Sequence, residues 1–370
     1  MPNVGKSTLF NALLKKTIAD VANYPFCTIE PNVGIVEVPD PRLPVLAKIV
    51  NTKKIVPAIV EFYDIAGLVK GASQGEGLGN KFLSHIREVA AIVHVVRLFE
   101  DGNIIHVANK VDPAADMKII EQELILADLE TLSKQKQPRG NASKSEIATY
   151  EVAQRLSKEL NSGISARQVN LNDEEKELAK QFNLLTIKPV LYLFNVSEKQ
   201  LENKDQAEKQ IKNVIASASE AIPNKIATSP AAPRNDIKSH LYLCAKLENE
   251  IVGLNEAEQK EYLQQYGLSD TGLDRLIKES YKLLDLISFL TAGEIEARAW
   301  TIKKNTTAPQ AAGTIHTDFE KNFIKADIVK YQDFVDLAGW TKAREQGKVQ
   351  IMGRDYIMQD GDVVEFKVNC

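Results

Sequence analysis

The first residues of the chain have the types and spacing needed to bind phosphate. Gly5, Lys6 and Ser7 occupy the last three fixed positions of the phosphate-binding loop pattern G-x-x-x-x-G-K-[ST]. In such a loop, consecutive backbone N–H groups surround phosphate oxygens, and the helix that follows adds its positive N-terminal end. Lys6 is then expected to reach the β- and γ-phosphates, and the Ser7 hydroxyl to ligate Mg²⁺. The pattern predicts a nucleoside triphosphate site.

The pattern begins before this sequence does. Its first glycine would lie one residue before Met1, and the strand that normally leads into the loop would also lie upstream. We therefore expect the natural product to start upstream of Met1, with the first strand of the sheet missing from this chain.

A second motif supplies groups for Mg²⁺ and for the terminal phosphate. Asp64 and Gly67 form a D-x-x-G pattern directly after a strand-like run at 58–64. In this pattern the carboxylate holds the Mg²⁺ water shell and the glycine N–H contacts the γ-phosphate. Thr28 lies between the two motifs, where a threonine would complete the Mg²⁺ ligands. An ordinary loop threonine is the alternative.

The residue after Gly67 is Leu68, where many GTPases carry a glutamine that orients the attacking water. Leucine cannot form that hydrogen bond. His85 follows a glycine-rich run at 71–79, which has the composition of a mobile loop that closes on phosphates. His85 is therefore a candidate for positioning water, and a histidine on a helix surface is the alternative.

Two segments compete for recognition of the base. Asn109 to Asp112 spells N-K-x-D, a guanine-reading pattern, and Asn195 to Glu198 spells N-x-x-E. Ligands bind at the carboxyl ends of parallel strands, and Asn195 ends a clear strand. Asn109 follows the preceding strand too closely for a crossover of about a dozen residues. We therefore interpret the first segment as a decoy and expect base contacts from Asn195, with Cys244 and Ala245 after the next strand.

The pattern of apolar residues predicts the elements that position these groups. Strands are expected at 33–39, 58–64, 90–97, 189–195 and 241–244. Because helical segments separate them, we predict an α/β fold with a mainly parallel sheet. Segments 117–129 and 146–160 have helical periodicity and predict an antiparallel hairpin or short coiled coil. A loop is expected at 222–236, a helix at 272–286, and a small α+β tail with strands at 297–302 and 363–368.

Composition narrows the class of protein. The 370 residues, 44% hydrophobic and 26% charged, fit a soluble globular protein of two or three domains. The net charge of −4 argues against the whole chain being an electrostatic nucleic-acid binder. Three widely spaced cysteines favour a reducing compartment, and there is no signal peptide or bilayer-spanning apolar run. We expect a cytoplasmic protein with no membrane contact.

Together these motifs resemble the YchF, or Obg-like ATPase, family of P-loop GTPases. The resemblance covers essentially the whole chain. It rests on the strings at 2–8, 23–32, 64–72, 75–80, 308–313 and 316–320.

The resemblance implies a P-loop NTPase G domain of the OBG type at 1–112 and 187–285. It also implies a helical coiled-coil insertion at 113–186 and a β-grasp (TGS) domain at 286–370. It implies ATP hydrolysis in preference to GTP, because Glu198 stands where guanine-specific relatives carry aspartate. The phosphate loop carries over to Asn3, Val4, Gly5, Lys6, Ser7 and Thr8, the Mg²⁺ ligands to Ser7 and Thr28, the base contact to Val196 and the loop histidine to His85.

The resemblance further implies binding to the ribosome, and we expect a monomer. His316 and a basic face in the tail are candidates for contacting RNA or protein there, although a solvated charged surface explains them equally well. The basic residues are Lys303, Lys304, Lys321, Lys325 and Lys330. Two other functions stay open: a GTPase of the same fold, and a binding protein with little affinity for nucleotide. Cys27, beside Thr28, is expected to be buried and inert.

Overall fold

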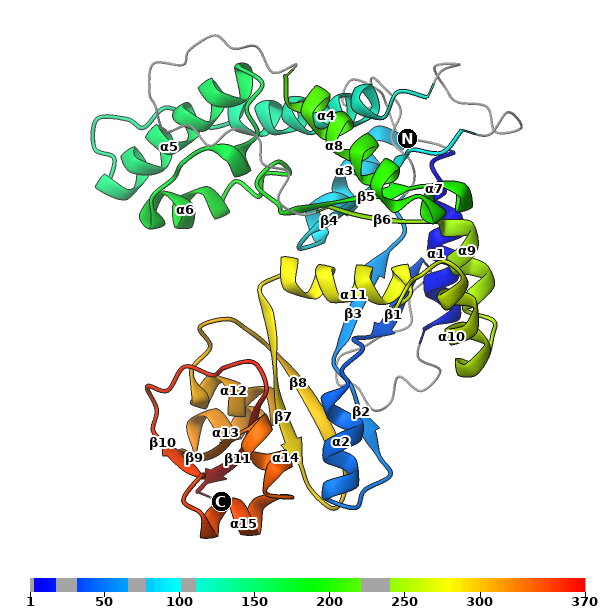
Figure 1. The fold of residues 1–370 in the computed structure, drawn as a ribbon. Helices are drawn as coiled ribbons and strands as arrows, with labels where there is room; N and C mark the ends of the chain where they lie inside the picture. The colour runs from blue at the N-terminus through cyan, green and yellow to red at the C-terminus, as the bar shows by residue number, and fades with distance from the viewer. Residues whose placement is uncertain (1–2, 18–31, 66–77, 101–110, 221–239, 370) are drawn as a thin grey trace. The chain divides into compact units, whose positions relative to one another are not determined.

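The computed structural model describes residues 3–17, 32–65, 78–100, 111–220 and 240–369. They belong to two compact units, each assembled from segments far apart in the sequence (Figure 1). One unit combines Met1–Lys15 with Tyr63–Gly272, and the other combines Lys16–Phe62 with Leu273–Cys370. The predicted domain boundaries concern domains along the sequence, whereas these units are defined by compactness. The predicted boundaries therefore stay a prediction.

A parallel sheet forms the centre of the first unit. Strand β5 (Val190–Asn195) lies between β4 (Ile92–Arg97) and β6 (His240–Leu243), and both pairs are parallel. In the register of this sheet, Arg97 lies beside Asn195, which lies beside Leu243. The carboxyl ends of the three strands therefore meet at one edge, as parallel pairing requires. This confirms the α/β fold with a parallel sheet.

Helices pack on this sheet through apolar side chains. Val96 and Phe194 from the strands form one buried cluster with Met117 of α4 and Ile211 of α8. Helix α4 begins where the sequence supplies its start signals: the Asp112 carboxylate accepts a hydrogen bond from the Ala115 N–H at 3.0 Å, and proline follows at the first helical position. The helices of this unit are α1 (Lys6–Lys15), α3 (Leu78–Glu88), α4 (Pro113–Ser133), α5 (Lys144–Asn161), α6 (Asp173–Lys180), α7 (Glu198–Glu202), α8 (Lys204–Glu220), α9 (Ala245–Ile251) and α10 (Glu256–Gln265).

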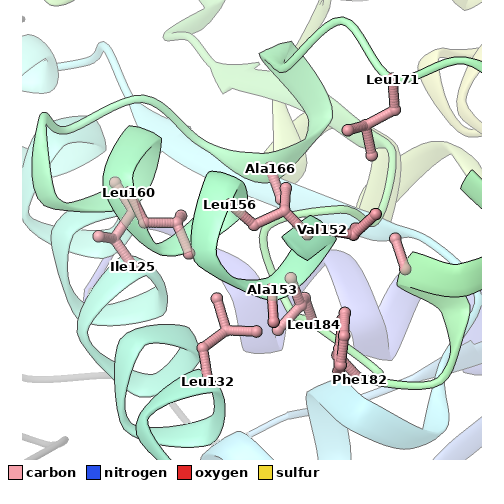
Figure 2. Close-up of a cluster of buried hydrophobic side chains, with 11 residues drawn as sticks. Ile125, Leu132, Val152, Ala153, Leu156, Leu160, Ala166, Leu171, Phe182 and Leu184 are labelled. Carbon is pink, nitrogen blue, oxygen red and sulfur yellow. The ribbon is translucent and has the colours of Figure 1, made fainter. Parts of the chain in front are cut away.

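Helices α4 and α5 confirm the two helices predicted from periodicity, and a third helix joins them. Ser143 begins α5 with a capping box, in which its hydroxyl accepts from the Glu146 N–H and the Glu146 carboxylate accepts from Ser143 N. Figure 2 shows the apolar core that these helices share with the 3₁₀ turn Ala166–Gln168 and the segment around α6. Its buried members are Ile125, Leu132, Val152, Ala153, Leu156, Leu160, Ala166, Leu171, Ala179, Phe182 and Leu184. The hairpin is therefore completed into a small helical subdomain.

The second unit contains the remaining predicted strands. Strands β1 (Val33–Glu37) and β3 (Ile59–Tyr63) pair with each other. A six-stranded mixed sheet has the order β10-β9-β11-β7-β8-β2. Its strands are β2 (Ile55–Val56), β7 (Leu286–Ala292), β8 (Ala297–Lys303), β9 (Phe323–Lys330), β10 (Gln350–Met352) and β11 (Asp362–Val368). The helices are α2 (Arg42–Ile49), α11 (Gly272–Leu283), α12 (Ala308–Ile315), α13 (Thr317–Lys321), α14 (Tyr331–Asp336) and α15 (Trp340–Glu345).

The core of the second unit lies between this sheet and helix α12. Three small residues of the helix, Ala308, Ala311 and Ala312, are fully buried in one cluster with Phe289 and Ile328 of the sheet. Small side chains let the helix approach the strands closely. A mixed sheet with a helix packed on one face is the β-grasp arrangement that was expected for the tail.

No helix among the described residues is both long and apolar enough to cross a bilayer. The predicted loop at 222–236 lies outside the described residues.

Candidate functional site

The phosphate loop has the backbone conformation that only glycine supports. Gly5 has φ +91° and directly precedes helix α1, whose first turn is closed by the Leu9 N–H donating to the Gly5 carbonyl at 3.0 Å. A Cβ atom on Gly5 would lie 2.1 Å from Asn195 Nδ2. Glycine is therefore required here both by its backbone angle and by the close approach of a side chain.

Asn195 joins the phosphate loop to the turn after β6. Its amide nitrogen donates to the Val4 carbonyl at 2.9 Å, and its amide oxygen accepts from the Ala245 N–H at 2.9 Å. The side chain is 5% exposed, so both bonds are made in the interior, where an unpaired amide would be costly. The structure thus brings together three predicted segments that are separated by 50 and 191 positions.

Lys6 and Asp64 also meet. The Lys6 ammonium lies 2.6 Å from Asp64 Oδ1 and 2.5 Å from the Ile65 carbonyl oxygen. Both side chains are partly exposed. The two motifs that the sequence places 58 positions apart therefore share one site. The contact of Lys6 with the Ile65 carbonyl could not be predicted from the sequence, because every residue carries a backbone carbonyl and no side-chain type marks this one.

The oxygen atoms near Lys6 fit a magnesium ion. Ser7 is exposed at the start of α1, and Asp64 supplies a carboxylate. Mg²⁺ prefers hard oxygen ligands and keeps several waters, so one or two protein oxygens suffice. Within the described ranges no group of three or more His, Cys, Asp or Glu side chains forms a metal cluster. Thr28, Cys27, Gly67 and Leu68 lie outside the described residues.

The base end of the candidate site is built from two strand ends. Val196 and Cys244 are almost completely buried in one apolar cluster with residues of α9, and burial raises the pKa of the Cys244 thiol. A contact between Val196 and a base stays a prediction. Glu198 begins helix α7, and its Oε1 lies 3.0 Å from the ammonium of Lys246. Reasoning from the sequence missed this pair, because 48 positions separate its members and only folding brings the two turns together.

His85 lies in helix α3 and is half-buried. Among the described residues, no hydrogen bond or ion pair to its side chain is found. Thr8 and Asn3 lie in the first turn of α1 and in the loop before it. Asp112, from the segment interpreted as a decoy, caps helix α4, and Asn109 and Lys110 lie outside the described residues.

The predicted basic face is partly neutralised inside the second unit. Lys330 lies 2.6 Å from the fully buried carboxylate of Asp362, and Lys325 lies 3.3 Å from Asp327. Lys304 lies 3.7 Å from Asp285. His316 is exposed and caps α13, where its Nδ1 accepts from the Asp318 N–H at 3.3 Å. These pairs reduce the positive charge available to a phosphate backbone.

Comparisons with known families agree with this arrangement. A family model described as "50S ribosome-binding GTPase" matches residues 1–150. A second model, YchF-GTPase_C, described as a protein of unknown function, matches residues 286–369.

Individual relatives match over almost the full chain. A protein of Bacillus subtilis named "Ribosome-binding ATPase YchF" is 48% identical over 100% of this chain and 97% of its own length. A protein of Haemophilus influenzae with the same name is 45% identical over the same shares. A solved structure described as the Schizosaccharomyces pombe YchF GTPase is 37% identical, with a TM-score of 0.83 over 99% of this chain and 96% of that one.

Proposed function

Because this chain belongs to the YchF family, we propose that it is a ribosome-binding, Mg²⁺-dependent ATPase that hydrolyses ATP to ADP and phosphate. The protein would act as a nucleotide-dependent switch in translation and the stress response. It would work as a monomer in the cytoplasm, with ATP and the ribosome as its partners and no membrane contact.

The observation that best supports this proposal is the pair of bonds made by Asn195. They hold the loop at Val4 against the turn at Ala245, so the proposed phosphate end and the proposed base end of the site would keep a fixed relative position. A nucleotide whose phosphates bind the loop would then also have its base positioned at the base end of the site. Phosphoryl transfer needs mainly such positioning and charge neutralisation.

We propose the following roles for the chain's own residues. Backbone N–H groups from Asn3 to Thr8 would bind phosphate oxygens, and the Lys6 ammonium would exchange Asp64 and the Ile65 carbonyl for the β- and γ-phosphates. Mg²⁺, held by Ser7 and Thr28, would neutralise charge on the transferred group. Asp64 would orient the water shell of the ion, Gly67 would donate its N–H to the γ-phosphate, and His85 would position the attacking water.

The Lys6 assignment is tested by matched lysine substitutions on one helix. Lys6→Ala should abolish ATP hydrolysis, because the charge facing the transferred phosphate is lost. Lys15 lies at the far end of α1, where its ammonium donates to the Asn249 carbonyl at 3.0 Å. The variant Lys15→Ala should hydrolyse ATP at the wild-type rate. Turnover by Lys6→Ala equal to that of the wild type would refute the active-site assignment.

The preference for ATP over GTP needs its own test, since the matching family model and the solved relative are both described as GTPases. ATP and GTP should be competed against a fluorescent nucleotide on the wild type and on Glu198→Asp. We expect ATP to win on the wild type, and the aspartate variant to shift towards GTP. A clear GTP preference by the wild type would contradict the role of Glu198.

Binding to the ribosome is tested separately by cosedimentation with purified ribosomes at two salt concentrations. If the protein bound nucleotide but did not cosediment with ribosomes, the ribosome would be rejected as its partner. Cosedimentation without heat from ATP and Mg²⁺ in a titration would favour a binding protein with little affinity for nucleotide.

A further inference from the structure

Positive charge is concentrated at the tip of the helical hairpin, between the end of α4 and the start of α5. Residues 134–144 carry four cationic side chains and no carboxylate, in a chain whose net charge is −4. The cationic residues are Lys134, Lys136, Arg139 and Lys144, and all four are exposed. We call residues 134–144 the basic tip.

The two carboxylates that flank the basic tip are already bound. Glu130 lies 2.7 Å from the Lys134 ammonium, one helical turn away. Glu146 completes the capping box of α5, where its carboxylate accepts from the Ser143 N–H at 2.7 Å and from the Ser143 hydroxyl at 2.8 Å. Neither carboxylate is therefore available to the other three cations of the tip.

Those three cations have no protein partner. In the part of the chain that the structure describes, no ion pair or hydrogen bond holds the side chains of Lys136, Arg139 and Lys144. The predicted basic face of the tail differs, because three of its five lysines lie beside carboxylates. The basic tip thus has more positive charge available to a polyanion than the tail does.

The stability of the hairpin does not explain these charges. Lys144 is the first residue of α5, where the helix dipole disfavours a cation. A residue that breaks a local rule in this way is expected mainly at functional sites. The tip itself is open, since a Cβ atom on Gly140 would meet no atom within 4 Å. Below it, Leu132 and Val152 are buried in the shared core, so the loop is carried by a rigid support.

The residue types of the basic tip fit an RNA backbone better than a protein surface. Protein interfaces depend on aromatic and large apolar anchors and are depleted in lysine, and the tip has only Pro138 and Ala142 as apolar residues. Lysine, arginine and side-chain amides are the usual donors to phosphate and sugar oxygens. The tip supplies such amides at Gln135, Gln137 and Asn141. Without an aromatic side chain it has no platform for stacking unpaired bases.

From these observations we infer that the basic tip binds double-stranded segments of ribosomal RNA through their phosphate backbone. The inference deepens the ribosome binding of the proposed function and rests on it. The other end of α4 packs on the parallel sheet through Met117, and a rise of 1.5 Å per residue places the tip roughly 25 Å further along the helix. Substitutions in the tip should therefore leave ATP binding and hydrolysis in the absence of ribosomes unchanged.

The double variant Lys136→Gln/Arg139→Gln tests the tip by removing two charges while keeping polar side chains. We expect its affinity for purified ribosomes to fall about tenfold at roughly 0.1 M salt. The slope of log affinity against log salt concentration should decrease by about one unit for each charge removed. Arg139→Lys keeps the charge and should bind ribosomes as the wild type does.

Lys176→Gln/Lys180→Gln is the matched control. It removes the same charge from α6 of the same subdomain, where both lysines lie beside carboxylates, Asp173 at 2.8 Å and Glu177. This variant should keep the wild-type affinity and salt dependence. An equal loss of affinity in the tip variant and the control would show that net charge alone acts, and would overturn the inference.

Crosslinking decides between RNA and an acidic protein as the partner. A photo-reactive benzophenone amino acid at position 137, between Lys136 and Arg139, should form an adduct in intact ribosomes that ribonuclease removes. The same amino acid at position 177 in α6 should form none. An adduct with a ribosomal protein that survives ribonuclease would overturn the inference in favour of an acidic protein surface.

Failure of this inference can be told apart from failure of the proposed function. If the wild type cosediments with ribosomes and the tip variant binds equally well, the inference is wrong and the ribosome stays the partner. If the wild type does not cosediment, the proposed partner is wrong, and titration with deproteinised ribosomal RNA decides the inference alone. Binding that the tip variant weakens would then support an RNA site, and equal or absent binding would overturn it.

Discussion

Both compact units bury polar and charged side chains, Asp362 of the second unit among them, but the two units differ in what lies at their centre. The unit built on β4, β5 and β6 buries polar and charged side chains that bind backbone groups of distant segments, as Asp128, Asn195 and Glu248 do. The unit built on the six-stranded sheet is centred on a continuous apolar cluster, in which Phe289 stacks near Trp300 and meets Phe366 edge-on.

The difference follows from what each kind of interaction does. Apolar burial supplies most of the free energy of folding but has little directional preference. Buried hydrogen bonds add less net stability, yet they fix atoms in place because an unpaired partner is costly. The buried hydrogen bonds of the first unit therefore suit a site whose parts must keep fixed relative positions. The apolar core of the second unit suits a stable domain.

The largest effect is expected from Phe289→Ala in the second unit. Phe289 is fully buried, and truncation of such a residue leaves a cavity that costs about 4 kcal/mol. Urea unfolding with hydrogen exchange should place this loss in residues 286–369. Ile295→Ala, at a side chain that is 82% exposed, should have almost no effect. Equal loosening of the first unit by Phe289→Ala would contradict the distinction between the two cores.

A smaller effect is expected from Asp128→Ala in the first unit. The substitution leaves the N–H groups of Leu185 and Thr186 and one hydroxyl without their acceptor, at a cost of about 3 kcal/mol. We expect faster hydrogen exchange around Thr186 and weaker ATP binding, because the start of β5 is released. Glu130→Ala on the exposed side of the same helix should leave both unchanged. If Asp128→Ala changed neither hydrogen exchange nor ATP binding, buried hydrogen bonds would not explain how the parts of this unit are held in place.

The smallest effect concerns pH. Glu121 binds Arg167 at 2.6 and 2.8 Å; burial opposes its ionisation, yet the guanidinium holds the pKa of the carboxyl below its ordinary value of 4.5. A lowered folded pKa stabilises the fold above the unfolded pKa, and this contribution is lost as the pH falls through the folded value. The difference in unfolding free energy between wild type and Glu121→Gln should therefore be largest near neutral pH and shrink below pH 4.5. A difference that stays constant down to acidic pH would show that charge plays no part.

Much of the fold could be predicted because it depends on local pattern. The runs that became β4 and β5 are short and apolar and end at polar residues, and the spacing in α4 and α5 is helical throughout. In the structure the two strands begin one or two residues later than predicted, and the two helices extend beyond their predicted ends. The structure also adds α6, whose short and mostly charged sequence carries little apolar signal.

Pairing between elements was harder to predict. Strand β2 is only two residues long, yet it pairs in parallel with β8, with Ile55 beside Ala297. Nothing local in Ile55 and Val56 indicates a partner more than two hundred positions away. Likewise, Lys246 follows the β6 turn as an ordinary surface lysine until folding places it beside Glu198.

The sequence by itself determined the residues on which the proposed chemistry rests: a glycine, a lysine and a serine at fixed spacing, an aspartate after a strand, and an asparagine at a strand end. It supplies them directly because side-chain type and spacing are local properties, and the roles proposed for these residues stay predictions. Only the tertiary structure decided that Asn195 reaches Val4, that Lys6 meets Asp64 and that α4 supports both α3 and the start of β5. Such neighbours are separated by tens to hundreds of positions, and packing of the whole unit, not spacing along the chain, selects them.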